Sequence, residues 1–183
     1  MPLNRGFFPG IFTMGNVVCG FFALLSVLEG NVPAACWLIL LAGVLDVLDG
    51  KVARLSGANS QFGVELDSLA DFLSFGVAPG IIVYSLTLVS IGKLSWIVPV
   101  IYIMAAAYRL ARYNLMADSE EKKDFLGLPV PGAALGLVSF TIFSFNLWGE
   151  IIHLELFIGM TLVLSFLMVS QVEYESLPDR YQS

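Results

Sequence analysis

The residues from Asp46 to Asp71 read DVLDGKVARLSGANSQFGVELDSLAD and place four aspartates inside two strongly apolar segments. Two groups within this stretch recur at helical spacing, and each would form one stripe along a helix: Asp46, Asp49, Gly50 and Ala53, then Gly63, Asp67 and Asp71. If the two helices pack face to face, the four carboxylates converge beside a gap left by glycine and alanine. The stretch therefore predicts a metal site with room for a ligand next to it.

The cost of burying these carboxylates indicates what must accompany them. A charged side chain costs about 2.5 to 3.5 kcal/mol at the centre of a membrane helix, so four cost on the order of 10 kcal/mol. Lys51 and Arg54 are close in sequence, but two cations do not neutralise four clustered anions. Oxygen ligands without histidine or cysteine select Mg²⁺, Mn²⁺ or Ca²⁺ over zinc. Two alternatives stay open: an ion or proton transporter that uses the acidic cluster, and an intramembrane aspartyl protease, which needs two aspartates sharing one proton.

The composition is that of a membrane protein, because 57% of the 183 residues are hydrophobic and the mean hydropathy is +0.83. Six apolar runs approach the roughly 20 residues that cross a bilayer: 12–28, 33–55, 64–87, 94–115, 132–148 and 154–172. The sequence thus predicts an all-α polytopic membrane protein with three parts: an interfacial segment at 1–11, a six-helix domain at 12–172 and a polar tail at 173–183. We expect no cleavable signal peptide, because Asn16 interrupts the first run and no small-residue cleavage site follows it.

The basic residues predict the orientation of the chain. With six crossings, one side of the membrane receives eight of the nine lysines and arginines, and the other receives only Lys93. Both termini and the aspartate-bearing helix ends are therefore expected in the cytoplasm. The net charge is −6, so the chain lacks the excess of basic residues that is typical of proteins that bind nucleic acid. Cys19 and Cys36 lie near opposite ends of neighbouring spans, so we expect two buried thiols rather than a disulfide.

Other polar residues in the apolar runs allow two interpretations each. Thr13 is suited to cap the first helix, and Asn16 either bonds a neighbouring helix or points into the aspartate site. Arg109 and Arg112 share one helix face, where they serve either as membrane anchors or as a bidentate anion site. The segment 76–80 contains Pro79 between two glycines and should kink or loosen its helix.

The acidic stretch also resembles a known family signature. Its pattern is Asp46-x-x-Asp49-Gly50-x-x-Ala53-Arg54, eight residues, then Gly63-x-x-x-Asp67-x-x-x-Asp71, and it is similar at every fixed position to the CDP-alcohol phosphotransferase family. The wider sequence resembles the branch of bacterial and archaeal phosphatidylserine synthases over four segments: 13–20, 65–79, 109–114 and 127–131. These segments cover about the first two thirds of the chain, whereas the last two apolar runs add only topology.

The resemblance implies six transmembrane helices, usually in a homodimer, and attack by an alcohol on CDP-diacylglycerol with release of CMP. In this branch the alcohol is L-serine, while sister branches that use glycerol 3-phosphate or an inositol phosphate share every catalytic aspartate and remain the alternative. The residues carried over are of three kinds: metal ligands at Asp46, Asp49, Asp67 and Asp71; CDP contacts at Asn16, Gly50, Ala53 and Arg54; and groups for the serine carboxylate or a lipid phosphate at Arg109 and Arg112. Asp71 would also be the general base. We expect Mg²⁺ or Mn²⁺ as the cofactor, with two ions bound.

Overall fold

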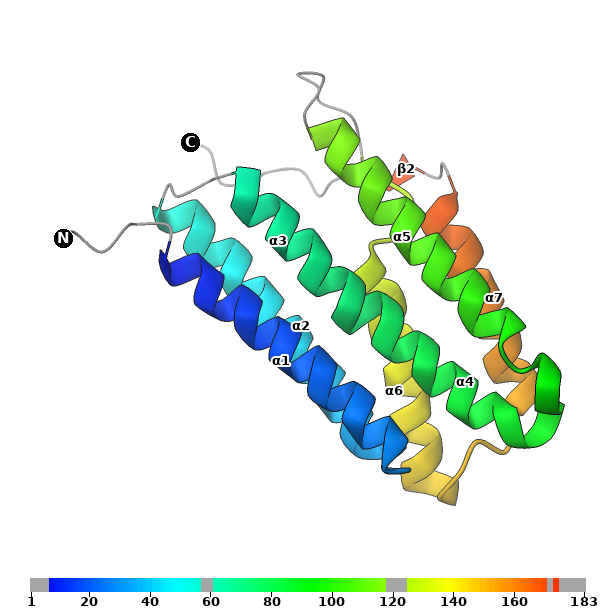
Figure 1. Ribbon diagram of the computed structural model, residues 1–183. Helices are drawn as coiled ribbons and strands as arrows, with labels where there is room; N and C mark the ends of the chain where they lie inside the picture. Colours follow the sequence, from blue (N-terminus) through cyan, green and yellow to red (C-terminus); the bar gives the residue numbers. More distant parts are fainter. Residues whose placement is uncertain (1–6, 57–60, 118–124, 171–172, 175–183) are drawn as a thin grey trace.

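The computed structural model describes residues 7–56, 61–117, 125–170 and 173–174, and the regular secondary structure within these is helical apart from two short strands (Figure 1). The helical segments form six rods: α1 (Phe7–Leu28), α2 (Val32–Ser56), the joined α3 (Gln61–Asp71), η1 (Phe72–Val77) and α4 (Ala78–Ile91), then α5 (Ile97–Ala117), α6 (Val130–Trp148) and α7 (Leu154–Val169). A 3₁₀ turn, η2 (Gly92–Leu94), follows α4, and the two-residue strands β1 (Phe125–Leu126) and β2 (Glu173–Tyr174) pair antiparallel. The predicted all-α class is confirmed in these ranges.

Four of the rods are long and apolar enough to cross a membrane: Gly10–Leu28, Val32–Ala53, Gln61–Leu88 and Val130–Trp148. Of the other two, α7 has only 16 residues, and α5 becomes polar near its end at Arg109, Arg112 and Asn114. The chain is thus a multi-pass membrane protein, while six crossings and cytoplasmic termini stay predictions. Residues 1–6 and 175–183, which hold most of the predicted interfacial segment and tail, lie outside the described residues.

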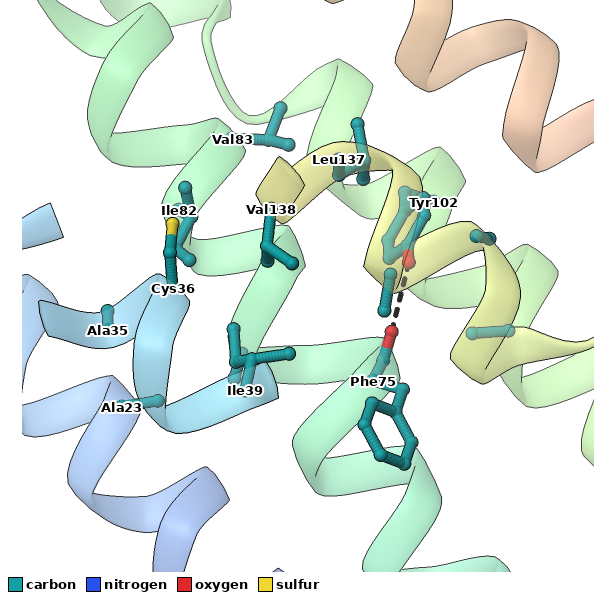
Figure 2. Packing of buried hydrophobic residues seen from close by; sticks show 14 of the residues in the cluster. Ala23, Ala35, Cys36, Ile39, Phe75, Ile82, Val83, Tyr102, Leu137 and Val138 are labelled. Atoms are coloured by element: carbon teal, nitrogen blue, oxygen red, sulfur yellow. Dashed lines mark hydrogen bonds between the residues drawn. The ribbon is translucent and has the colours of Figure 1, made fainter. Parts of the chain in front are cut away.

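The joined rod α3, η1 and α4 runs through the middle of the bundle (Figure 1). It packs against α1 on one side and α5 on the other, and α6 covers it from behind. Figure 2 shows the buried side chains of Ile39, Phe75, Tyr102 and Leu137, which come from four different segments and meet in the core. Because the helices alternate in direction, the end of α2, the start of α3 and the end of α5 lie at one end of the bundle, called here the acidic end.

A π-helical turn interrupts the central rod directly after Asp71. Pro79 has no N–H, so the α-helical bond to the carbonyl of Phe75 four residues earlier cannot form. The Tyr102 hydroxyl donates a 3.0 Å hydrogen bond to that carbonyl instead (Figure 2). The structure agrees with the expectation that the helix loosens near this proline, and it adds the residue on α5 that satisfies the carbonyl.

Tyr102→Phe should therefore destabilise the fold. The substitution removes the buried hydrogen bond that Tyr102 donates to the Phe75 carbonyl, and a bond of this kind contributes about 0.5 to 1.5 kcal/mol. Thermal unfolding of the purified protein in detergent should show a lower midpoint than the wild type. The matched control is Tyr84→Phe on α4, where the ring is 36% exposed. Equal midpoints for the two variants would show that the Tyr102 bond contributes nothing to stability.

Close packing between α1 and η1 fixes the register of these two segments. A Cβ at Gly20 would clash with the Ser74 hydroxyl and lie 3.1 Å from the Ser74 Cα. With glycine there, Ser74 Oγ donates a 2.9 Å bond to the carbonyl of Asn16. This contact places Asn16 against the turn that follows Asp71. Cys19 and Cys36 are buried free thiols, as predicted.

Candidate active site

Three of the four aspartates meet at the acidic end of the bundle. Asp46 on α2 and Asp67 and Asp71 on α3 have carboxylate oxygens that lie within 4.8 Å of one another. Asp71 is 9% exposed, and the other two are partly buried. The two stripes recognised in the sequence therefore do face each other across the α2 and α3 interface.

The fourth aspartate, Asp49, lies outside this group of three and is held by α1. Its Oδ2 accepts a 2.7 Å hydrogen bond from Thr13 Oγ1, and its Oδ1 is buried without a hydrogen-bond partner. The sequence suggested only a capping role for Thr13. The spacing of Thr13 indicates a contact with the aspartate site as well. Thr13 stands one helical turn before Asn16, so the two side chains share the helix face that meets the aspartates.

Asn16 points into the aspartate site, which decides between the two interpretations of this residue. Its side chain is fully buried, and Nδ2 donates a 3.1 Å hydrogen bond to Asp71 Oδ1. The amide oxygen of Asn16 is buried without a hydrogen-bond partner, as is Asp49 Oδ1. A buried polar atom left in this state costs about 1 to 3 kcal/mol, so both atoms favour a ligand that supplies partners to them.

The glycine of the first stripe borders open space. A Cβ at Gly50 would meet no heavy atom within 4 Å. Ala53 stands one turn further along α2 and is partly buried. Together these residues leave one stretch of α2 without bulky side chains beside Asp46. The Arg54 side chain lies outside the described side chains, so its predicted CDP contact stays a prediction.

The two arginines of α5 have different surroundings. Arg112 donates from Nη1 to the carbonyl of Val169 at 3.1 Å and from Nη2 to the carbonyl of Ser170 at 3.1 Å, so it satisfies carbonyls at the end of α7. Among the described residues, each arginine has a buried Nε without a hydrogen-bond partner and lies within 6 Å of the centre of a tyrosine ring. They differ in burial, because Arg109 is only 5% exposed. Arg112 is thus bonded to the end of α7, and a role of either arginine in binding an anion stays a prediction.

The donor set of the acidic group fits a hard divalent cation. Two unit charges 4.8 Å apart repel by about 3 kcal/mol at an effective dielectric constant of 20. Among the described side chains, no basic group forms an ion pair with Asp46, Asp67 or Asp71 to offset this repulsion. Carboxylate oxygens alone favour Mg²⁺, Mn²⁺ or Ca²⁺. The group can therefore hold such a cation at the acidic end.

Comparison with known proteins connects this geometry to a family. The family model described as CDP-alcohol phosphatidyltransferase matches residues 7–169, which span all six rods. This chain belongs to the CDP-alcohol phosphatidyltransferase family. The resemblance that rested on the spacing of the aspartates is confirmed, and the family is one of transferases. The transporter and protease alternatives are set aside accordingly.

Three relatives are similar to this chain over most of its length. The CDP-diacylglycerol–serine O-phosphatidyltransferase of Helicobacter pylori (strain J99) is 36% identical over 177 residues, which cover 95% of this chain and 74% of the relative. The enzyme of the same name from Bacillus subtilis (strain 168) is 34% identical over 168 residues, covering 92% and 89%. The archaetidylserine synthase of Methanothermobacter thermautotrophicus is 39% identical over 168 residues, covering 91% and 68%.

Proposed function

We propose that this enzyme is a phosphatidylserine synthase, which transfers the phosphatidyl group of CDP-diacylglycerol to the hydroxyl of L-serine and releases CMP. The grouping of Asp46, Asp67 and Asp71 carries the proposal, because it gathers three of the four aspartates of the signature at one end of the bundle, in a chain of this family. The names of the three relatives specify different lipids, but all of them specify serine. Serine is therefore favoured as the acceptor. Sister enzymes with glycerol 3-phosphate or an inositol phosphate as acceptor remain the alternative.

The acidic group would bind Mg²⁺ or Mn²⁺, with two ions shared among Asp46, Asp49, Asp67 and Asp71. The unpartnered Oδ1 of Asp49 supports its place among the ligands, although Asp49 stands outside the group of three. When bound, the divalent cations would screen the pyrophosphate charge and stabilise the CMP that leaves.

Asp71 would act as the general base. In the proposed step, the serine hydroxyl oxygen attacks the phosphorus that carries the diacylglycerol, and the bond from this phosphorus to the CMP oxygen breaks. The hydroxyl proton passes to the Asp71 carboxylate. Asn16 supports this role because its 3.1 Å bond to Asp71 Oδ1 orients the carboxylate and leaves Oδ2 as the oxygen that takes the proton.

The remaining side chains would position the two substrates. Gly50 and Ala53 would let the CDP moiety approach α2 closely, with Asn16 and Arg54 as polar contacts. Arg109 would bind the serine carboxylate or a lipid phosphate through its planar fork. Arg109 and Asp71 lie at similar depths from the acidic end of the bundle, which fits that role. Arg109 stands eight residues before the end of α5, and Asp71 stands ten residues after the start of α3. These separations correspond to roughly 12 and 15 Å of helix.

We place the site on the cytoplasmic side of the cell membrane. The distribution of basic residues supports this orientation, because eight of the nine lysines and arginines fall on one side of a six-helix topology. We also propose a homodimer, which is the usual state of the family that the signature resembles.

An acceptor panel tests the proposed reaction. The purified protein is supplied with CDP-diacylglycerol and Mg²⁺ or Mn²⁺, and CMP release is measured with L-serine, glycerol 3-phosphate or an inositol phosphate. CMP release should require serine and should stop when a chelator removes the cation. Release with glycerol 3-phosphate but not with serine would move the enzyme to a sister branch. Release that persists in the chelator would exclude a role for the cation.

A further inference from the structure

A side cleft of about 240 Å³ separates α3 from α5. It lies on a different face of α3 from the stripe of Asp67 and Asp71. Its lining comes from two helical faces: Glu65, Ser68, Leu69 and Phe72 on the central rod, and Ala107, Leu110, Ala111 and Asn114 on α5. The two alanines on the α5 face are too short to fill the space, so close packing does not hold the helices together here.

One side chain, Asn114, bridges this cleft. Ser68 Oγ donates a 3.1 Å hydrogen bond to Asn114 Oδ1, and Asn114 Nδ2 donates a longer bond of 3.4 Å to Glu65 Oε2. Its amide thus contacts two successive turns of α3 from a single position on α5. Both hydrogen bonds join α3 to α5 across the cleft.

The bridge connects the two helices that carry the proposed chemistry. On one face, α3 presents Asp71 to Asn16 of α1 at 3.1 Å, and on another it is held by Asn114. Arg109 stands five residues before Asn114 on the same α5 helix. A shift of α3 away from α5 would therefore change the separation between Asp71 and Arg109. Misplacing a reacting group by 1 Å can cost about 100-fold in rate.

We propose that Asn114 is a positioning residue, which sets the separation between the Asp71 and Arg109 helices through its bonds to Ser68 and Glu65. The inference rests on the proposed function, in which both groups act on the same reaction. Asn114 does not touch the reacting atoms in this proposal. It acts by holding α3 at a fixed distance from α5.

A double-mutant cycle tests this role through the kinetics of CMP release. Ser68→Ala and Asn114→Leu should each lower kcat about tenfold, with the KM for CDP-diacylglycerol unchanged within about twofold. The double variant should be no slower than the slower single variant, because both substitutions remove the same bond. Ser68→Thr keeps the hydroxyl and should restore kcat to within about twofold of the wild type.

The control is Ser85→Ala on α4, where the hydroxyl donates to the carbonyl of Ile82 in its own helix at 2.9 Å. It should leave kcat unchanged. Effects of the Ser68 and Asn114 substitutions that multiply in the double variant would overturn the proposal, as would wild-type kcat in Ser68→Ala. If Asn114→Leu does not fold, the comparison of Ser68→Ala with Ser68→Thr decides. If the wild type accepts an alcohol other than serine, the proposed acceptor is wrong, and the same variants test the bridge with that alcohol.

Discussion

Asp71→Asn is expected to lower CMP release by about 10²- to 10⁴-fold, which is the range that a general base contributes. Asparagine has nearly the same shape as aspartate, and its side-chain oxygen can still accept the bond that Asn16 donates at 3.1 Å. Asp46, Asp49 and Asp67 also remain to hold the cation. CDP binding, measured calorimetrically in the presence of Mg²⁺, should therefore change by only a few fold.

The matched substitution is Asp46→Asn, which removes a carboxylate from the same group of three without removing the base. It should weaken cation binding and CDP binding together. The two variants thus separate proton transfer from ligand binding. Near-wild-type turnover in Asp71→Asn would show that the proton of the acceptor goes to another group.

Gly50→Ala should weaken the binding of CDP-diacylglycerol without harming the fold. An added Cβ meets no heavy atom within 4 Å, and alanine is favoured over glycine in a helix by about 1 kcal/mol. The melting temperature should therefore hold or rise. If the CDP moiety approaches α2 at this point, the methyl group crowds the ligand. Such overpacking costs about 1 to 3 kcal/mol, or roughly 5- to 150-fold in affinity.

The control for this prediction is Gly20→Ala, the same substitution on the neighbouring helix. There the added Cβ would clash with the Ser74 hydroxyl, so the melting temperature should fall. Measuring the melting temperature and the KM for CDP-diacylglycerol on both variants distinguishes a packing glycine from a binding glycine. A wild-type KM in Gly50→Ala would exclude Gly50 from the CDP pocket.

The parts of the fold that depend on local patterns were predictable from the sequence. The six apolar runs correspond to the six rods in the described residues, because hydropathy is a property of each segment by itself. The meeting of Asp46, Asp67 and Asp71 followed from helical spacing together with the cost of leaving carboxylates alone in an apolar environment. Pro79 indicated a disturbed helix for a similarly local reason.

The parts that depend on which helices become neighbours were not predictable. The spacing of Thr13 and Asn16 puts both on one face of a helix, but it does not identify Asp49, 36 residues away, as the partner of the Thr13 hydroxyl. Likewise, Arg112 binds carbonyls more than 50 residues further along, a role that neither the anchoring nor the anion interpretation included. Asn16 could not be assigned from its position, because a partner in a membrane helix is set by packing and not by periodicity.

The π-helical turn has a consequence for the register of the whole central rod. Each α-helical residue advances the chain by about 100° around the axis, so one residue accommodated in a wider turn rotates everything beyond it by a comparable angle. The turn thus sets the rotation about the rod axis between two faces. One is the face of α3 that bears Asp67 and Asp71, and the other is the face of α4 that buries Ala78 and Val83. Insertion or deletion of one residue in this turn would rotate one half of the rod relative to the other. Such a change should therefore disturb the fold more than most side-chain substitutions.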